Sequence, residues 1–350
     1  MTDRMLNGST DRRSFLQSAG LAGAVGITGL AGCMGGGGET VTLTLSTYGG
    51  AFEDHMEANV AEPFAEQHDN VEVELAPYSG VSELEGMRDD PTIDVANLDD
   101  FLVFLGDEDL FLDLDPDIVT NETDQYDIAQ YDLDYAANSY LYRYALAVND
   151  EEQDPSAIQS YGDLWDSQYQ GEIAINTDWS IIMLLLSLGV GGDARNMDPL
   201  WENLPALSEN VEVFYENFTD PQQYLAQGQV TISSWFDGRS NFLADEGNPI
   251  TFHIPPEDGA VAGRGALVVM GNTDHPELSQ ELVNYALGPD AQQGYAEDLY
   301  YGPVNAEAEL SAELQETVAT EADFDELFVP EWDYIMDNVG TWRENWNANI

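Results

Sequence analysis

Short runs of alternating hydrophobic and polar residues predict half-buried strands at 41–46 and 71–75. Between these strands, apolar residues recur at every fourth position, namely Phe52, Met56, Val60 and Phe64. This spacing predicts a helix with one apolar face, which Pro63 should kink or restart. Strand, helix, strand is a parallel crossover unit, and it places the Tyr48-Gly49-Gly50 turn at the carboxyl end of a strand. Open α/β sheets bind their ligands at such ends.

The same alternation predicts further strands, at 93–98, 144–148, 172–175, 230–234, 250–254 and 265–270. Asp220-Pro221 has the preferred order of cap and proline for the start of a helix, and Gly228 should end that helix. Two more helices are expected, at 276–287 and 332–346. Strands that alternate with helices indicate an α/β fold, and a body of about 310 residues suits two lobes rather than one domain.

The beginning of the chain has the features of an export signal. Arg12-Arg13 is the centre of a twin-arginine motif, and an uncharged segment rich in Ala, Gly and Leu follows it. Leu30-Ala31-Gly32-Cys33 resembles a lipobox, at which a precursor is cut and its new N-terminal cysteine is lipidated. We therefore expect a twin-arginine lipoprotein signal peptide at 1–32, followed at 33–40 by a lipidated Cys33 and a glycine-rich tether.

The charge of this chain is one-sided. It contains 67 acidic residues against 9 basic ones, and all of the basic residues are arginine. Such charge is typical of a disordered acidic segment or of a protein adapted to high salt, and the 43% hydrophobic content favours a folded protein. At molar salt the Debye length is about 3 Å, so surface carboxylates hardly repel one another. The composition thus indicates a halophilic, haloarchaeal-type protein and excludes nucleic acid as a partner.

The absence of lysine excludes several chemistries. P-loop, Schiff-base and pyridoxal phosphate sites need a lysine, and the chain also lacks a G-x-S-x-G elbow and an H-E-x-x-H zinc motif. Its four histidines lie far apart, and acidic clusters such as Asp107-Glu108-Asp109 are expected to be solvated surface rather than metal sites. The sequence therefore predicts no catalytic residue, no cofactor and no metal, and a protein that is not an enzyme.

A set of short motifs occurs in a characteristic order: Thr47-Tyr48-Gly49-Gly50, Ala145-Leu146-Ala147-Val148-Asn149, Tyr161-Gly162-Asp163-Leu164-Trp165, Gly171-Glu172-Ile173-Ala174-Ile175, Trp235-x-x-Gly238-Arg239, Pro255-Pro256-Glu257-Asp258-Gly259 and Gly302-Pro303-Val304-Asn305. In this order they resemble the solute-binding proteins of ABC importers, in the spermidine/putrescine-binding branch. The resemblance implies a type II periplasmic-binding-protein fold, with two α/β lobes joined by a hinge and the ligand cleft between them. Crossings are expected near Asn149 and Gly265. The resulting parts are one lobe at 41–148 plus 265–308, a second lobe at 149–264, and C-terminal helices at 309–350 that pack on the lobes.

The resemblance and the export signal together imply a receptor that is lipid-anchored at the exterior face of the cell membrane. Such a receptor captures a small polar solute and delivers it to an ABC permease and its ATPase subunits, and it is expected to be a monomer. A secreted hydrolase with paired carboxylates, a ferric-ion receptor using Tyr300-Tyr301 and a surface interaction protein remain alternatives. Asn121 and Asn217 lie in sequons at which such a surface protein could be glycosylated.

The resemblance places ligand contacts on Tyr48, Gly49, Gly50, Asp99 (or Asp100), Asp178, Trp179, Trp235, Asp237, Arg239, Arg264 and Tyr301. Aromatic faces and carboxylates together suit an organic cation such as a polyamine, although each aromatic side chain could instead belong to the core.

One departure from the family pattern affects the ligand. Polyamine-binding relatives carry an aromatic and an acidic residue just before the strand that corresponds to 267–270, whereas this chain has Gly263 and Gly265 there, with Arg264 between them. An arginine in the cleft would repel a polyamine and suit a carboxylate or phosphonate. A polyamine-like cation and an amino acid or organic anion therefore both remain candidate ligands.

Overall fold

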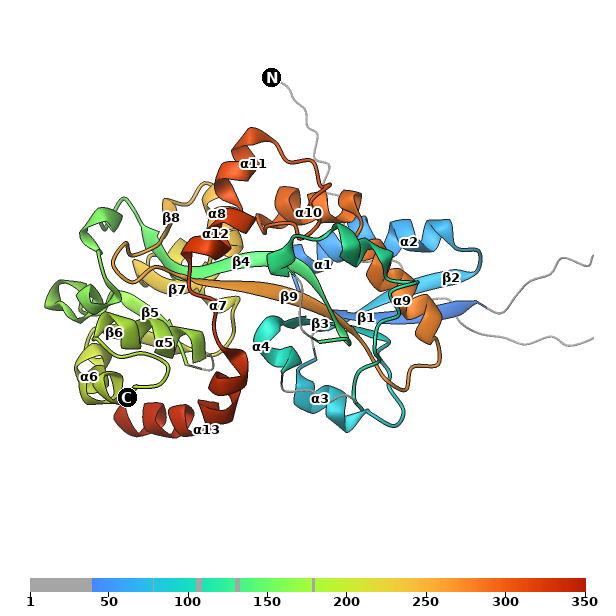
Figure 1. The fold of residues 1–350 in the computed structure, drawn as a ribbon. Coiled ribbons are helices and arrows are strands. Elements are labelled where there is room, and N and C mark those ends of the chain that lie inside the picture. Colours follow the sequence, from blue (N-terminus) through green and yellow to red (C-terminus); the bar gives the residue numbers. More distant parts are fainter. Residues whose placement is uncertain (1–39, 78, 105–108, 130–132, 178–179) are drawn as a thin grey trace, which may run out of the picture. The chain divides into compact units, whose positions relative to one another are not determined.

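The structure is a computed structural model that describes residues 40–77, 79–104, 109–129, 133–177 and 180–350. Within these ranges, one mixed sheet has the strand order β2-β1-β3-β9-β4-β7-β5-β6, and β8 pairs with β4 (Figure 1). The strands are β1 Val41–Thr47, β2 Val71–Pro77, β3 Val95–Asp99, β4 Ala136–Asn149, β5 Ile173–Asn176, β6 Val211–Tyr215, β7 Ile232–Phe236, β8 Ile250–His253 and β9 Val261–Val269. All predicted strands are present, and β6 is an addition. The predicted signal peptide and Cys33 lie outside the described residues.

The first half of the sheet consists of the parallel strands β1, β2 and β3. Between β1 and β2 the chain forms α1 (Ala51–Met56), a π-helical turn (Glu57–Ala61) and α2 (Glu62–Gln67). The predicted apolar stripe is buried, since Met56, Val60 and Phe64 are at most 1% exposed. Pro63 lies in the first turn of α2, directly after the π-helical turn. The helical path is continuous from Ala51 to Gln67, and the irregularity predicted at this proline takes the form of that π-helical turn.

The second half of the sheet consists of the parallel strands β5, β6 and β7. Its helices are α5 (Ser180–Gly189), α6 (Asp198–Ser208), α7 (Asp220–Ala226) and α8 (Asp237–Asp245). Helix α7 begins at Asp220 as predicted, but Thr219 is the residue at its N-cap, so the expectation that Asp220 caps the helix was wrong. Asp220 instead places its carboxylate in the first turn, where it interacts favourably with the helix dipole.

Two long strands, β4 and β9, are antiparallel and lie between the two halves (Figure 1). Along β4, the segment from Ala136 to Tyr144 pairs with β9, the segment from Tyr144 to Val148 pairs with β7, and the segment from Leu146 to Asn149 also pairs with β8. The exchange of pairing partners along β4 therefore falls at Tyr144. The exact lobe boundaries stay predictions.

Two glycines of β9 allow close packing against β4. Tyr140 lies opposite Gly265, and Tyr142 lies opposite Gly263. A Cβ atom at Gly265 would lie 2.0 Å from the Tyr140 ring, and a Cβ atom at Gly263 would lie 2.2 Å from the Tyr142 ring. The tyrosine rings of β4 thus occupy the space in which side chains at these β9 positions would lie.

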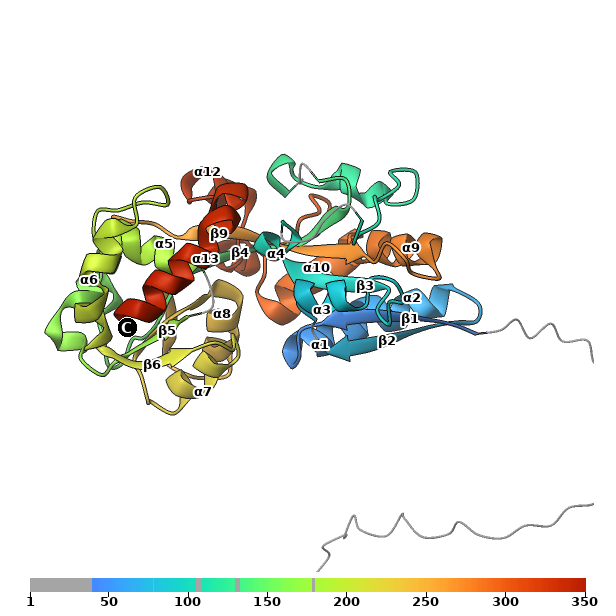
Figure 2. The ribbon, with the colours of Figure 1, turned by 90° about the horizontal axis from the view of Figure 1, so that it is seen from below.

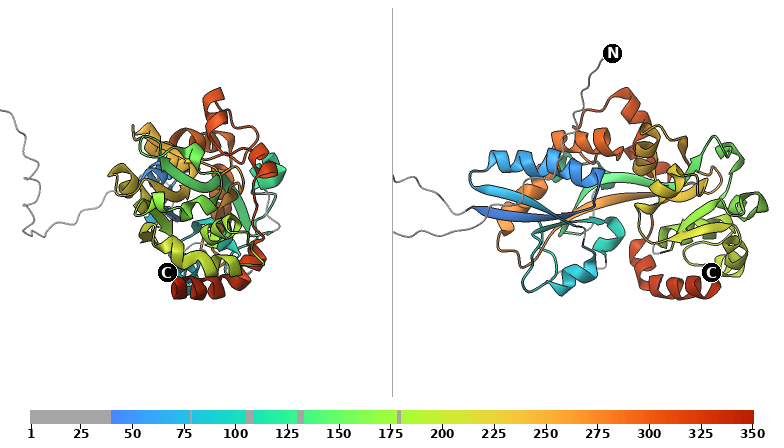
Figure 3. Two further views of the ribbon diagram at one scale, coloured as in Figure 1. Left: turned by 90° about the vertical axis from the view of Figure 1, so that its left-hand side faces the viewer. Right: turned by 180° about the vertical axis from the view of Figure 1, so that it is seen from behind.

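Helices cover both faces of the first half of the sheet. Seen from behind, α1 and α2 lie on one face of β1 and β2, and α3 (Val81–Gly86) lies on the other (Figure 3). Phe52 and Met56 of α1 belong to the larger apolar core, whereas Val81 and Leu84 of α3 belong to a separate, smaller one. The core is therefore built on the two sides of the sheet.

The remaining helices are α4 (Asp100–Val103), α9 (Pro276–Ala286), α10 (Pro289–Leu299), α11 (Ala312–Thr317), α12 (Glu321–Glu326) and α13 (Trp332–Asn349). Helices α9 and α13 were predicted from the sequence, and each begins at the expected residue. Among the described residues, no helix has the length and apolar character needed to cross a membrane.

Candidate ligand-binding site

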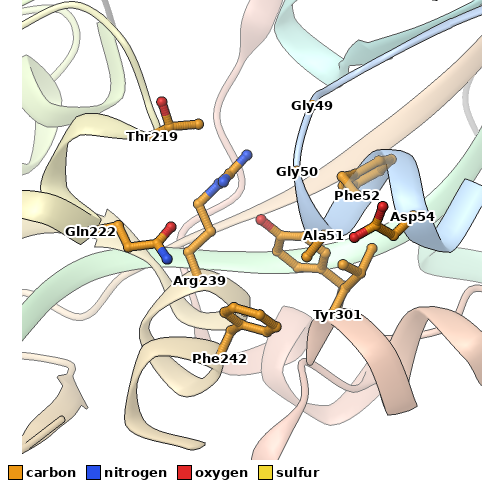
Figure 4. Close-up of a pocket in the computed structure, with 12 residues that line it drawn as sticks. Gly49, Gly50, Ala51, Phe52, Asp54, Thr219, Gln222, Arg239, Phe242 and Tyr301 are labelled. Carbon is orange, nitrogen blue, oxygen red and sulfur yellow. The ribbon is translucent and has the colours of Figure 1, made fainter. Parts of the chain in front are cut away.

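A cavity of about 490 Å³, here called cavity A, is lined by the β1–α1 turn of the first half and by helices α7 and α8 of the second (Figure 4). Its lining residues are Gly49, Gly50, Ala51, Phe52, Asp54, Thr219, Gln222, Gly238, Arg239, Phe242, Leu299 and Tyr301. Gly50 is the N-cap of α1 and has a φ of 72°, a conformation that L side chains rarely adopt. This glycine allows the chain to turn sharply from β1 into α1 at the edge of the cavity.

A second cavity of about 570 Å³, here called cavity B, adjoins cavity A. Its lining residues are Tyr48, Gly49, Phe101, Leu102, Glu216, Asn217, Phe218, Thr219, Arg239 and Arg343. The two cavities share Gly49 from the first half and Thr219 and Arg239 from the second. We therefore treat them as one candidate site that extends on both sides of the Arg239 side chain.

Arg239 presents the positive charge of this site. In Figure 4 its guanidinium extends from α8 into the space between Thr219 and the Gly49-Gly50 turn. Within the described part of the chain, no carboxylate forms an ion pair with it. Burial raises the pKa of Tyr301, and the charge of Arg239 opposes that shift. Tyr301 is therefore neutral near pH 7, and no carboxylate of the described residues compensates the charge that Arg239 presents to the cavity.

The first-half wall of the site is aromatic. Tyr301 stacks on Tyr140 with ring centroids 4.9 Å apart, and Phe52 packs against Tyr140 with centroids 5.5 Å apart. The hydroxyls of Tyr48 and Tyr140 donate hydrogen bonds to the two carboxylate oxygens of Asp99, at 3.1 and 3.4 Å. Burial, with the Asp99 charge as a second cause, raises the pKa of Tyr140 well above its ordinary value. Asp99, 4% exposed and outside both cavities, thus holds the tyrosines in place.

Asp237 lies beneath the cavity rather than in it. Its side chain is fully buried and accepts hydrogen bonds from Arg143 Nε at 2.8 Å, from the Arg143 backbone N–H at 3.1 Å and from the Gly238 N–H at 2.8 Å. Burial raises the pKa of Asp237, and the charge of Arg143 opposes that shift. Arg143 also donates to the backbone carbonyl of Thr317. The predicted ligand contact at Asp237 is therefore a structural ion pair, because its carboxylate is saturated by protein donors.

Trp235 and Arg264 also line neither cavity. Trp235 is 1% exposed, and its Nε1 donates to the carbonyl of Phe218 at 2.8 Å, so it supports the Phe218 segment from within the core. Arg264 donates from Nη1 to the carbonyl of Ile128 at 3.1 Å. Asp178 and Trp179 lie outside the described residues. Of the predicted contacts, the structure brings together Tyr48, Gly49, Gly50, Arg239 and Tyr301.

Several lining residues escaped sequence reasoning. Thr219 and Gln222 come from the start of α7, Phe242 from α8 and Glu216 from the segment after β6. The Asp220-Pro221 helix start marked that segment as a strand-to-helix connection, yet nothing in the sequence placed it beside the Gly49-Gly50 turn. The position of Arg343 in cavity B was also not predicted, because Arg343 lies more than 100 residues from Arg239 in the sequence.

The chain matches a known protein family. A family model described as bacterial extracellular solute-binding protein matches residues 59–322. The chain therefore belongs to the extracellular solute-binding protein family, and its fold is of the periplasmic-binding-protein type, as predicted.

Individual relatives show two ligand specificities. The chain is 26% identical to the spermidine/putrescine-binding periplasmic protein of Escherichia coli, over 63% of each chain, which is less than two thirds of that relative. It is 24% identical to a gamma-aminobutyric acid-binding protein of Pseudomonas aeruginosa, over 84% of this chain and 85% of the relative. A crystal structure of an ABC transporter from Clostridium perfringens superposes with a TM-score of 0.69 at 25% identity, over 87% of this chain and 99% of the other.

The family argues against two of the alternatives considered from the sequence. Its members bind solutes outside the cell, which supports a receptor over a hydrolase. In the described residues, no group of three His, Cys, Asp or Glu side chains is arranged to hold a metal ion. Of the two tyrosines considered for iron, Tyr301 lines cavity A and Tyr300 lines neither cavity. A ferric-ion receptor therefore has no support in the described site.

Proposed function

We propose that this protein is the solute receptor of an ABC importer and that its solute carries a carboxylate, as an amino acid or small organic anion does. The observation that carries this proposal is Arg239, which lines both cavities without a carboxylate partner among the described residues. A guanidinium fork matches the two oxygens of a carboxylate and would repel a polyamine. The half-buried setting strengthens such a pair relative to one in water.

The walls of the site also suit the rest of such a solute. Asp54 in cavity A and Glu216 in cavity B provide carboxylates that could accept an ammonium group. Tyr301 and Phe52 provide apolar surface for the carbon chain between the charged groups. The relative named for gamma-aminobutyric acid, a molecule with one carboxylate and one ammonium group, aligns over more of this chain than the spermidine/putrescine relative does. An amino acid-like zwitterion therefore fits the site better than a polyamine.

The proposed cellular setting rests on the sequence. Arg12-Arg13 and the Leu30 to Cys33 lipobox support twin-arginine export and lipid anchoring at the exterior face of the membrane. From there a monomeric receptor would pass its solute to a permease and its ATPase subunits. The excess of acidic residues supports a halophilic protein. A Cys33→Ala protein should fold but appear in the medium; its retention at the membrane would contradict lipid anchoring.

Calorimetry in molar potassium chloride tests the ligand class. The purified protein is titrated with 4-aminobutyrate, glutamate, short organic acids, putrescine and spermidine. We expect a carboxylate-bearing solute to bind most tightly and Arg239→Gln to weaken it by about 1.5–3 kcal/mol, the value of a hydrogen bond to a charged group. Arg264→Gln is the matched control, because Arg264 lines neither cavity and should leave affinity unchanged. Tightest binding of a polyamine, or chemical conversion of the solute, would refute the proposal.

A further inference from the structure

A pocket of about 480 Å³ is formed by the beginning of β4 and the chain segment that precedes it. We call it the Asn138 pocket, and its lining includes Asp113, Glu122, Gln125, Asp134, Ala136 and Asn138. It shares no lining residue with cavity A or cavity B. Figure 2 shows the segment 109–129, coloured blue-green to green, at the top of the view above α9. The Asn138 pocket is therefore separate from the candidate ligand-binding site.

Hydrogen bonds hold the wall of this pocket in place. The 3₁₀ turn Thr120–Asp124 is attached to α9, because the Asn121 side chain donates to the carbonyl of Asn284 at 2.7 Å and the Asn121 backbone N–H donates to the Asn284 side chain at 2.8 Å. At the end of this turn, Gln125 Nε2 donates to the carbonyl of Asn138 at 2.9 Å. The turn that carries Glu122 is thus attached both to α9 and to β4.

Asn138 presents an unpaired amide to the pocket. Ala136 and Asn138 line the pocket and Ala137 between them does not, so the pocket lies on the face of β4 toward which the Asn138 side chain points. Asn138 is 1% exposed, and neither its Oδ1 nor its Nδ2 has a hydrogen-bond partner among the described residues. A buried amide without partners is destabilising. A ligand group that both donates and accepts a hydrogen bond, such as a hydroxyl or an amide, satisfies this side chain.

The charged groups that line the pocket are all acidic. Glu122 is half-buried, Asp113 and Asp134 are exposed, and none of the three forms an ion pair with a described basic residue. Partial burial raises the pKa of Glu122 from 4.5 to about 7, and a cation beside it would stabilise the ionised form. Among the described residues, no group of three His, Cys, Asp or Glu side chains is arranged to hold a metal ion. The separated carboxylates therefore suit an organic cation better than a metal ion.

We propose that the Asn138 pocket is a second binding site, which takes a small organic ammonium ion that also carries a hydroxyl or amide group. The ammonium group pairs with Glu122, and the hydroxyl or amide group pairs with the Asn138 side chain. Leu114 and Ala136 provide apolar surface for the carbon atoms between these groups. Such a ligand needs no carboxylate, so it differs from the solute proposed for Arg239 and binds independently of it.

The experiment compares ammonium ions that differ in one hydroxyl group. Ethanolamine is paired with propylamine, and aminobutanol with pentylamine, because a methyl group of similar size replaces the hydroxyl in each amine. Binding to the full protein is followed by ligand NMR line broadening in molar potassium chloride, where a Debye length of about 3 Å screens the attraction to exposed carboxylates. We expect at least one amino alcohol to bind about tenfold more tightly than its paired amine, since only the amino alcohol satisfies the buried amide.

Three variants assign the binding to this pocket. Asn138→Leu should abolish the preference for the amino alcohol and leave the protein folded, because it removes a buried amide that lacks partners. Glu122→Gln should weaken both members of a pair about tenfold, since both carry the ammonium group. Asn97→Leu is the matched control, because Asn97 is fully buried, its amide also lacks partners, and it lines neither this pocket nor cavity A or B. It should leave the preference unchanged.

Other outcomes would overturn the proposal. If no ammonium ion binds in molar salt, solvent alone satisfies the Asn138 amide. Equal binding of both members of each pair would exclude recognition of the hydroxyl by Asn138, and an equal loss of preference in folded Asn97→Leu protein would show that the preference arises elsewhere. Loss of amino alcohol binding in Arg239→Gln would place the ligand in the candidate site instead. The affinity for carboxylate solutes is measured separately, so failure of the Asn138 pocket leaves the proposed function standing.

Discussion

Two arginines near the amino end of helix α8 have opposite surroundings. Arg143, below the helix, has a side chain that is 12% exposed and pairs with Asp237 and Asp323. Arg239, in the first turn of the helix, lines both cavities and forms no ion pair with a described carboxylate. Among the described residues, carboxylates therefore saturate Arg143 and leave Arg239 without an ion pair, although the chain has 67 acidic residues. This difference supports the proposal that Arg239 binds an anionic solute.

The sequence Asp237-Gly238-Arg239 joins these two regions. Asp237 faces the buried pair, Gly238 packs against the Leu299 to Tyr301 segment, and Arg239 faces the cavity. Substitutions of Asp237, Gly238 and Arg239 should therefore distinguish effects on the stability of the fold from effects on ligand affinity.

The largest effect is expected for Asp237→Asn, which leaves the Arg143 guanidinium buried with only Asp323 as a charged partner. Removing one member of a buried ion pair costs about 3–5 kcal/mol, and we expect the free energy of unfolding to fall by an amount in this range. Urea denaturation in molar salt measures this change. The double variant Asp237→Asn/Arg143→Met should recover part of the loss, since no buried charge then lacks a partner. A loss below about 1 kcal/mol in the single variant would show that the pair is not what stabilises this region.

A smaller effect is expected for Gly238→Ala, which adds a methyl group between the two regions. Its Cβ would lie 2.6 Å from the carbonyl oxygen of Leu299 and 2.6 Å from the ring of Tyr301. Such overpacking costs about 1–3 kcal/mol, and the displacement of Tyr301 should also weaken ligand binding. The matched control is Gly340→Ala in α13, where nothing lies within 4 Å of the new Cβ and helix propensity should raise stability slightly. Equal thermal stability of the two variants would contradict the close approach at Gly238.

The smallest effect concerns Glu122, a half-buried carboxyl whose pKa is raised by partial burial from its ordinary value of 4.5 to about 7. Glu122 contrasts with Asp237, because burial is the whole cause of its pKa shift and no arginine opposes that shift. The stability that this group contributes is full below about pH 4.5 and is lost as the pH rises through about 7, so Glu122→Gln should raise the free energy of unfolding above pH 7. Since part of the group is in contact with solvent, we expect about 1 kcal/mol. Glu313→Gln, at an exposed position, is the control; equal flattening of the stability–pH profile in both variants would exclude burial as the cause.

Most of the strands could be predicted because hydrophobic and polar residues alternate wherever only one face of a strand is buried. Strand β1, with Leu43 and Leu45 inward, and the stripe of α1 and α2 are of this kind. The length of β4 could not be predicted, since its residues from Ala136 to Tyr142 are buried on both faces and show no alternation. Strand β6 was missed for a different reason: it is only half-buried, and its Glu212 and Phe214 give a weak pattern.

The candidate site was predictable only in part. Residues at the carboxyl end of β1 and in the first turn of α8, such as Gly49 and Arg239, follow from the rule that α/β sheets bind ligands at strand ends. Trp235 and Asp237 were expected to contact the ligand, but both side chains are buried away from cavity A. The sequence does not distinguish an aromatic ring or a carboxylate that faces a cavity from one that faces the core. The contribution of α13 depends on tertiary packing and has no local signature.

The paired positions Tyr140 and Gly265 make this part of the β4–β9 pair hard to change by single substitutions. An acidic or aromatic side chain at position 265 would collide with the tyrosine ring that covers the glycine. Replacing Tyr140 first would remove the stacking partner of Tyr301 and leave a void in the core. Either substitution alone is therefore harmful, and only the simultaneous exchange of both residues accommodates a side chain at position 265.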